Sequence, residues 1–135
     1  MKWKHMTEKD LHKLVEARFS KDFIDKKVVP MAAGIADIYE GEMVKLAPHD
    51  KGYLESNVHT KTKRSGNIIR SVITFGANYA AKVHEFPPDR RGPRTRAKPA
   101  TQFGAPGPKW VERVLRGLDY RYYLLKAQRK LLKGG

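Results

Sequence analysis

Two acidic side chains in a compact turn-forming segment are the first candidates for acid–base chemistry. Asp50 and Glu55 lie within residues 47–56, which also hold Pro48 and Gly52. A pair of carboxylates can act as general acid and base. Asp50, however, can also accept hydrogen bonds from nearby backbone N–H groups, while Pro48 fixes its own φ and Gly52 tolerates a positive φ. We therefore predict that Pro48, Asp50 and Gly52 form a structural turn and perform no catalysis.

Histidine is the second residue type with catalytic or metal-binding potential. The chain has five histidines and no cysteine, and no two histidines stand at the short helical spacing that metal sites often use. His84 and Glu85 form an adjacent histidine–carboxylate couple. Residues 79–86 alternate as a strand does, although their alanines would also suit a helical turn. We favour a strand, in which neighbouring side chains point to opposite faces and do not converge on one substrate atom. The sequence therefore predicts neither a metal ion nor another cofactor.

Two further enzymatic patterns are incomplete. Residues 104–109 read GAPGPK, which is glycine-bearing and basic but lacks the strand–GxxxxGK[ST]–helix arrangement of a phosphate-binding loop. The serines have no nucleophile-elbow context. A small hydrolase that uses Asp50, Glu55 or His84 remains only as a residual hypothesis. We predict a protein without enzymatic activity and without a small-molecule substrate.

A proline-rich basic segment is the one feature with an evident physical role. Residues 87–108 hold six of the eight prolines and the five candidate contact residues Arg90, Arg91, Arg94, Arg96 and Lys98. Because the segment has few N–H donors and few large apolar groups, we expect it to be a long, exposed, flexible loop. Its arginines could pair with DNA phosphates and release counterions. They could equally contact an acidic face of a neighbouring subunit, and the sequence leaves both alternatives open.

The overall composition indicates a single basic domain spanning residues 1–135. The net charge is +14, and residues 82–135 carry 14 basic and 4 acidic side chains, so +10 of this charge lies there. Such an excess favours a polyanionic neighbour, although a solvated surface explains it equally well. No apolar run approaches the roughly 18 residues that span a bilayer, and the amino-terminal residues lack the apolar core of a signal peptide. We therefore expect synthesis in a cytoplasm and no membrane partner.

The hydrophobic periodicity predicts helices in the amino-terminal third of the chain. Apolar residues recur at helical spacing over residues 7–24 and again over residues 30–46. Val28 and Val29 precede Pro30, which disfavours helical backbone there, so an extended step is expected between two helices. A single kinked helix is the alternative.

The middle of the chain shows the alternation that is typical of strands. Residues 56–63 and 68–75 alternate with a period of two, and a turn is predicted at residues 65–67, so the pair is expected to form a hairpin. Apolar residues on both sides of the segment 68–75 indicate burial on both faces for part of it. With residues 79–86 as a further strand, we predict a small antiparallel sheet of about three to four strands.

A carboxy-terminal helix completes the predicted α+β fold. It opens at Pro108 and carries a buried apolar stripe, and Gly117 within it marks a bend or a tight contact. Residues 131–135 are expected to form a loose tail. The predicted order is therefore N-terminal helices, a small antiparallel sheet, a long basic proline-rich loop and a C-terminal helix.

Three motifs in this order resemble the tail-completion, or neck, proteins of long-tailed bacteriophages, which are also described as minor tail or minor capsid components. The motifs are residues 47–56, which read A-P-x-D-x-G-x-L-x-S, residues 79–86, with Tyr-Ala…Glu-Phe, and residues 107–115 at the start of the last helix. The resemblance covers roughly residues 30–125. Lys51 and Pro87 depart from the pattern, and Pro87 alters the beginning of the variable loop.

The resemblance implies a structural role in the virion, at the junction of head and tail. Members of this family help attach the tail to the DNA-filled capsid. By this resemblance we expect a ring of copies of the chain, sixfold, around the DNA path, in contact with neighbouring neck or tail-terminator proteins. The alternative hypothesis is a free-standing protein that binds DNA without sequence preference.

Overall fold

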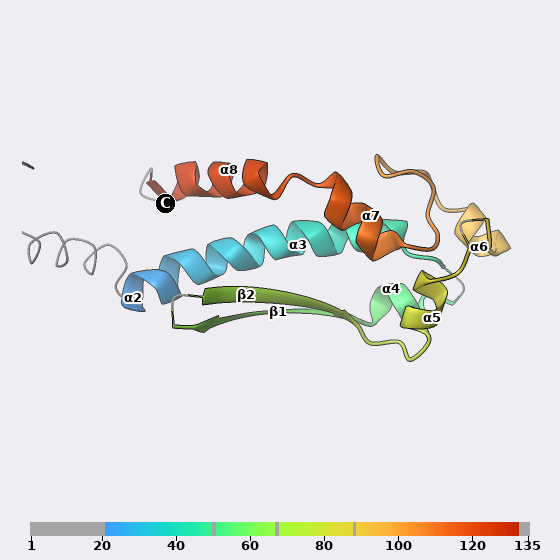
Figure 1. Ribbon diagram of the computed structural model, residues 1–135, viewed down its shortest axis with the longest axis horizontal. Helices are drawn as coiled ribbons and strands as arrows, with labels where there is room; N and C mark the ends of the chain where they lie inside the picture. Colours follow the sequence, from blue (N-terminus) through green and yellow to red (C-terminus); the bar gives the residue numbers. More distant parts are fainter. Residues whose placement is uncertain (1–20, 50, 67, 88, 133–135) are drawn as a thin grey trace, which may run out of the picture.

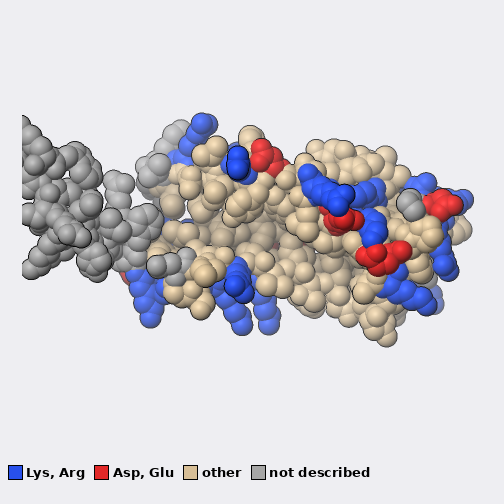
Figure 2. Space-filling view, in the orientation of Figure 1, with Lys and Arg blue, Asp and Glu red and all other residues tan. Residues whose placement is uncertain are grey.

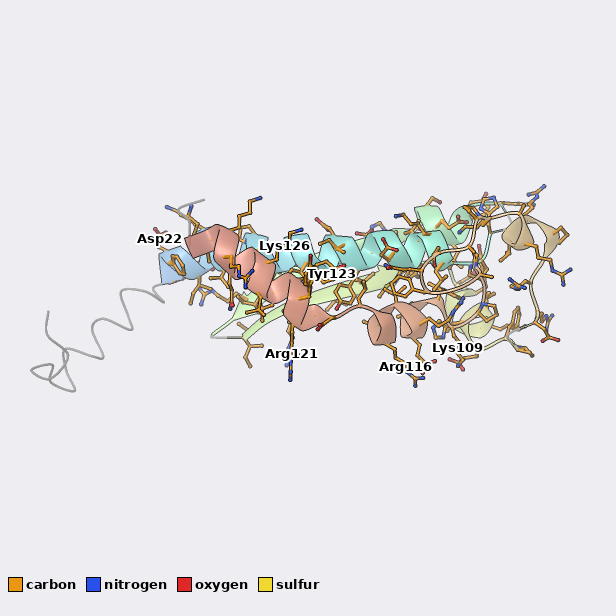
Figure 3. All side chains as sticks on the ribbon, turned by 90° about the horizontal axis from the view of Figure 1, so that it is seen from above. Asp22, Lys109, Arg116, Arg121, Tyr123 and Lys126 are labelled. Carbon is orange, nitrogen blue, oxygen red and sulfur yellow. The ribbon has the colours of Figure 1, made fainter. Side chains whose placement is uncertain are left out.

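The computed structural model describes residues 21–49, 51–66, 68–87 and 89–132, and it has the predicted α+β composition. The central element is α3 (Val29–Leu46), which lies between a β-hairpin on one side and the helix α8 (Tyr120–Leu132) on the other (Figure 1). Seen from above, α8 crosses over α3 (Figure 3). Three short helices gather at the end of the molecule where α3 ends: α4 (Tyr53–Ser56), α5 (Ala80–His84) and α6 (Pro93–Arg96).

The backbone that leads into α3 is helical throughout its described part. A short α2 (Lys21–Phe23) continues through the π-helical turn η2 (Ile24–Val28) into α3, and the N–H of Val29 donates to the carbonyl of Ile24. The predicted extended step at Val28–Val29 is therefore wrong, and the alternative of a single kinked helix is closer to this region, where a π-helical turn joins α2 to α3. Pro30 occupies the first turn of α3, where its missing N–H costs little. The rest of the helix predicted at residues 7–24 lies outside the described residues.

The predicted hairpin is confirmed. Strands β1 (Val58–Ser65) and β2 (Ile68–Phe75) pair antiparallel along their whole length, from Val58 opposite Phe75 to Ser65 opposite Ile68. Gly66 adopts a φ of 61° in the connecting turn, a conformation that suits glycine. Asn67, which was also assigned to this turn, lies outside the described residues. Ile68 and Val72 are more than half exposed, so the expected burial of β2 on both faces is wrong.

The sheet is smaller than predicted, because the described residues contain only these two strands. Residues 79–86 form the helix α5 and its flanks instead of a further strand. The alternation in this segment was compatible with a helical turn, and tertiary packing decides between the two: Ala80 is buried in the core, while Ala81 and Lys82 are exposed. One helical turn buries a single small side chain here, whereas a strand would need a partner strand beside it.

Polar contacts attach the inner face of the hairpin to the helices. Thr60 donates a 2.9 Å hydrogen bond to Glu40 of α3, and Arg64 donates a 2.7 Å hydrogen bond to Asp25 of η2. The hydrogen bond from Arg64 holds the pKa of Asp25 below its usual value. The hairpin therefore has a fixed orientation, with one face toward α3 and the other directed away from it (Figure 1).

The hydrophobic core lies where α3, the hairpin and α7 (Trp110–Gly117) meet. Trp110 is 1% exposed and contacts Phe75 edge-on, with ring centroids 5.6 Å apart. Tyr39 of α3 meets Tyr123 of α8 in a similar arrangement at 6.3 Å, and Figure 3 shows Tyr123 over α3. Each fully buried large apolar side chain contributes about 1.5–3 kcal/mol. The core therefore holds together elements from both ends of the described chain.

The single C-terminal helix of the prediction is two helices. α7 ends at Gly117, the backbone is extended at Leu118 with ψ of 135°, and α8 then begins at Tyr120. A Cβ atom at Gly117 would lie 2.5 Å from the ring of Phe103, so this glycine marks both the bend and the tight contact that were predicted. α8 extends to Leu132, so residues 131 and 132 are not a loose tail, and residues 133–135 lie outside the described range. Among the described helices, none combines the length and the apolar character that crossing a bilayer requires.

Candidate functional site

The turn after α3 is the first component of the candidate site. Leu46 and Ala47 are fully buried, and the backbone becomes extended at Ala47, where α3 ends. Gly52 has a φ of 84°, the left-handed conformation that was predicted for it, and Pro48 is half-buried. Residues 53–56 then form α4, a single helical turn. Asp50, the third predicted turn residue, lies outside the described residues.

Lys98 binds this turn from the proline-rich segment. Its Nζ donates to the carbonyls of Val44 at 3.1 Å and Ala47 at 2.6 Å, and to Oε2 of Glu55 at 3.0 Å. The two carbonyls belong to the last turn of α3 and its C-cap, where the helix has no backbone donors left to satisfy them. A cation at this position also interacts favourably with the helix dipole. Lys98, which was predicted to contact DNA or a partner, therefore caps α3.

Thr95 makes a second connection between the same two segments. Its hydroxyl accepts a 2.8 Å hydrogen bond from the N–H of His49 and donates a 3.0 Å hydrogen bond to the carbonyl of His49. Thr95 is 3% exposed, so both backbone groups of His49 are satisfied away from bulk water. No sequence pattern indicates this pair, because the two residues are 46 positions apart and belong to no recognised motif.

The proline-rich segment is consequently not exposed along its whole length. Thr95 and residues 106–108 are buried, Lys98 is largely covered, and residues 93–96 form α6. The expectation of a uniformly exposed loop is therefore wrong for these residues. The composition of this segment predicts few apolar contacts. Its polar side chains nevertheless form hydrogen bonds to the end of α3 and to the turn after it. That the segment is flexible in the isolated protein stays a prediction.

The four arginines of this segment have different environments. Arg90 is exposed and lies over the ring of Phe86, with its guanidinium carbon 4.1 Å from the ring centroid. Arg94 and Arg96 are exposed on α6, whereas Arg91 is partly buried and its Nε has no hydrogen-bond partner among the described atoms. Only Arg90, Arg94 and Arg96 are therefore well placed to meet another molecule. Figure 2 shows blue basic side chains at this end of the molecule.

Arg113 of α7, which the sequence analysis did not single out, holds the end of the segment. Its guanidinium donates to the carbonyls of Phe103 at 3.2 Å, Ala105 at 2.9 Å and Gly107 at 3.4 Å. Burial, followed by the nearby charge of Arg91, lowers the pKa of Arg113. An arginine in the first turns of a helix that follows a glycine- and proline-rich segment is the only sequence signal that could have suggested this role.

Residues 47–56, 79–86 and 107–115, the three motifs of the resemblance, meet in space. The N–H of Gly107 donates a 2.9 Å hydrogen bond to the carbonyl of Leu46, beside the first motif, and the N–H of Lys109 donates a 3.0 Å hydrogen bond to the carbonyl of His84. Their apolar residues join one buried cluster, which includes Ala47, Leu54, Ala80, Trp110 and Val114. We call this region the motif junction.

The candidate couple of His84 and Glu85 lies in the motif junction. Because residue 84 ends a helix, His84 Nδ1 and Glu85 Oε1 lie 3.1 Å apart, and the prediction that they point to opposite faces is wrong. Glu85 also accepts a hydrogen bond from Lys109, and the bonds from Lys109 and His84 keep its pKa below the usual value. His84 packs edge-on against Trp110 at 4.9 Å, and its Nε2 is buried. An ionised, paired carboxylate beside a covered imidazole is a poor general acid–base pair.

Glu55, another of the candidate carboxylates, also forms structural contacts. Glu55 accepts a 2.5 Å hydrogen bond from His49 Nδ1 on one oxygen, and Lys98 binds the other oxygen. This histidine–carboxylate pair was not recognised in the sequence, where the two residues are six positions apart. With both oxygens occupied, Glu55 has the role of a bridge between α4, the turn and the proline-rich segment.

The described residues contain no group of three or more His, Asp or Glu side chains that could hold a metal ion. The motif junction is thus a set of structural contacts flanked by exposed arginines. Comparisons with protein-family models, with curated proteins and with solved structures found no match to this chain.

Proposed function

We propose that this protein is a structural component of a bacteriophage virion that completes the tail and joins it to the head. In this proposal, copies of the chain form a ring, sixfold, at the neck around the DNA path. Neighbouring neck and tail-terminator proteins are its partners. The protein is made in the cytoplasm of the bacterial host and is then incorporated into the particle.

The observation that carries the proposal is the convergence of the three motifs. Residues 47–56, 79–86 and 107–115 are far apart in the chain, yet two backbone hydrogen bonds and one apolar cluster bring them together. Their convergence supports the interpretation that they define a common fold, and the resemblance then suggests the function.

The chemistry of the charged groups supports a structural role over an enzymatic one. Glu55 and Glu85 of the motif junction, and Lys98 of the proline-rich segment, each satisfy polar groups of the protein itself. Catalytic groups need access to a substrate atom. These side chains instead fix the ends of α3 and α5.

Exposed apolar side chains on the last two helices support assembly with neighbours. Leu115, Tyr120, Tyr122 and Leu125 are all more than half exposed on α7 and α8. Contact with a neighbouring subunit would cover these side chains and remove their apolar surface from water. The exposed Arg90, Arg94 and Arg96 at the other end of the molecule are proposed to bind an acidic face of a neighbouring subunit.

Deletion of the gene from the phage genome tests this proposal. We expect lysates with DNA-filled heads and separate tails, and joined particles restored when the wild-type chain is supplied in trans. A lysate that lacks the protein but still contains normally joined particles would rule the proposal out.

A second candidate function is sequence-independent DNA binding by the protein alone. It is favoured by the net charge of +10 on residues 82–135 and by the exposure of Arg94 and Arg96. Binding of this kind weakens steeply with salt, because cations on the protein release counterions from DNA. A slope near zero in a plot of log affinity against log salt concentration would exclude it, whereas a steep slope with normal particle assembly would favour it over the first proposal.

A further inference from the structure

The face of the hairpin that points away from α3 carries positive charges that have no acidic partner among the described residues. In β1 the exposed residues alternate with half-buried ones, so Lys61, Lys63 and Ser65 lie on the outer side. By the strand register, Val72 lies opposite Lys61, and Arg70 lies opposite Lys63. We define the outer hairpin face by Lys61, Lys63 and Arg70, with the hydroxyls of Ser65 and Thr74 beside them. Figure 2 shows blue side chains projecting from the lower edge of the molecule, where Figure 1 places the hairpin.

The inner and outer faces of the hairpin differ in how their charges are balanced. On the inner side Arg64 is paired with Asp25, and Thr60 is bonded to Glu40. On the outer side Lys61, Lys63 and Arg70 have no acidic partner within the part of the chain that the structure describes. The strand residues of the outer face include no Asp or Glu. All of its charged groups are hydrogen-bond donors.

The pairing of Lys63 with Arg70 is unfavourable for the isolated protein. These two cations stand directly opposite each other across the strands, and like charges in that position destabilise a hairpin. Lys61 adds a third positive charge about 6.8 Å along β1 from Lys63. Such a cluster is explained if a polyanion covers it and supplies the missing negative charge.

The shape of the element favours nucleic acid as that polyanion. A two-stranded ribbon fits the major groove of B-DNA, and lysine, arginine, serine and threonine are usual donors to its phosphates. Ile68 and Val72 are 57% and 56% exposed on the same side, where they can contact sugars without reading sequence. We propose that the outer hairpin face binds the phosphate backbone of duplex DNA.

This inference deepens the proposed function, on which it rests for the presence of DNA beside the protein. It assigns the DNA contact to the hairpin and leaves the arginines of residues 90–96 for protein partners. The head–tail joining role is tested on particles, whereas the hairpin is tested on the purified full chain. Failure of one therefore does not imply failure of the other.

The experiment measures binding to a 30-base-pair duplex of mixed sequence by fluorescence anisotropy over a range of salt concentrations. The test variant carries Lys61→Gln, Lys63→Gln and Arg70→Gln. The matched control carries Arg90→Gln, Arg94→Gln and Arg96→Gln and so loses the same charge. We expect the magnitude of the salt slope to fall by about 2.7 in the test variant, since each phosphate contact contributes about 0.9, and by less than about 1 in the control.

A single substitution separates binding from folding. Arg70→Glu replaces the repulsion with Lys63 by attraction, so the midpoint of urea unfolding should rise slightly while DNA affinity falls at least about tenfold at 0.1 M salt. Lower stability together with unchanged DNA binding would overturn the inference. It would also be overturned if the wild-type chain did not bind DNA, or if the control lost the larger part of the slope. Displacement of the DNA by polyglutamate at equal charge concentration would assign the face to an acidic protein instead.

Discussion

Lys98 donates a 2.6 Å hydrogen bond to the carbonyl of Ala47, a residue 51 positions earlier in the chain. Through this contact the basic segment fixes the turn that ends α3. The same ammonium group binds Val44 and Glu55, so one side chain connects the proline-rich segment to the last turn of α3, to its C-cap and to α4. We therefore regard this lysine as a structural residue and not as a DNA contact.

Replacing Lys98 by methionine should lower the free energy of unfolding by about 2 kcal/mol. The substitution preserves most of the apolar stem but leaves two carbonyls and the Glu55 carboxylate without their charged donor, and such bonds contribute about 1.5–3 kcal/mol. Urea denaturation followed by circular dichroism measures the change. Arg96→Gln, an exposed position two residues away, is the control and should change stability by less than about 0.5 kcal/mol. Equal losses in both variants would contradict the assigned role.

Thr95→Val tests the second connection between the same segments. The substitution keeps the size of the side chain but leaves the buried N–H and carbonyl of His49 without partners, which costs about 1–3 kcal/mol. Thr95→Ser retains the hydroxyl and should lose less. Urea denaturation of the two variants gives the comparison. If valine were tolerated as well as serine, the two hydrogen bonds at His49 would contribute nothing to stability.

Alanine substitution of Gly52 tests the conformation of the predicted turn, and alanine substitution of Gly41 in α3 is the matched control. Gly52→Ala should destabilise the protein by about 1–2 kcal/mol, because φ at this position is 84° and an L side chain is strained there. Space is not the cause, since the nearest atom to an added Cβ is 3.6 Å away. Gly41→Ala, on the exposed side of α3, should stabilise the protein by about 0.5–1 kcal/mol. Thermal unfolding of both variants measures the two changes in stability. Changes of the same sign would contradict the assigned conformation of Gly52.

The contact of Glu85 with Lys109 predicts a pH dependence of stability. Because folding lowers the pKa of Glu85, its contribution is fully present above its ordinary pKa and is lost as the pH falls through the lower, folded value. Glu85→Gln should therefore be less stable than the wild type at pH 7, with the difference shrinking in acid. Asp89→Asn removes an exposed carboxylate without an ion pair among the described residues and serves as the control. Unfolding midpoints between pH 3 and pH 7 measure this, and a pH-independent difference would disprove the contribution.

The hairpin and the turn could be predicted because their signals are local. The strand-like alternation over residues 56–63 and 68–75 indicated a hairpin, and the structure places its strands at residues 58–65 and 68–75. Gly52 stands at a position that only glycine occupies without strain. Residues 79–86 are too few to distinguish the periodicity of a strand from that of a helical turn. The burial of Ala80 in the core favours the helix. Pro30 indicated a break, yet a π-helical turn before it allowed the helix to continue.

The contacts of the candidate site were beyond local prediction. Thr95 and Lys98 lie in a segment whose prolines and arginines favour an exposed loop, and their partners are 46 and 51 positions away. No spacing rule relates a threonine to the backbone of a distant histidine. Likewise, the unpaired charges on the outer hairpin face become visible only when the strand register places Lys63 opposite Arg70.

The location of the protein in the virion tests the central claim most directly. A small affinity tag after residue 135, carried on a phage that still forms plaques, can be labelled with gold in purified particles and viewed by electron microscopy. The account predicts label at the junction of head and tail in intact particles. Purified particles that carry no label, or label only at another position, would contradict it.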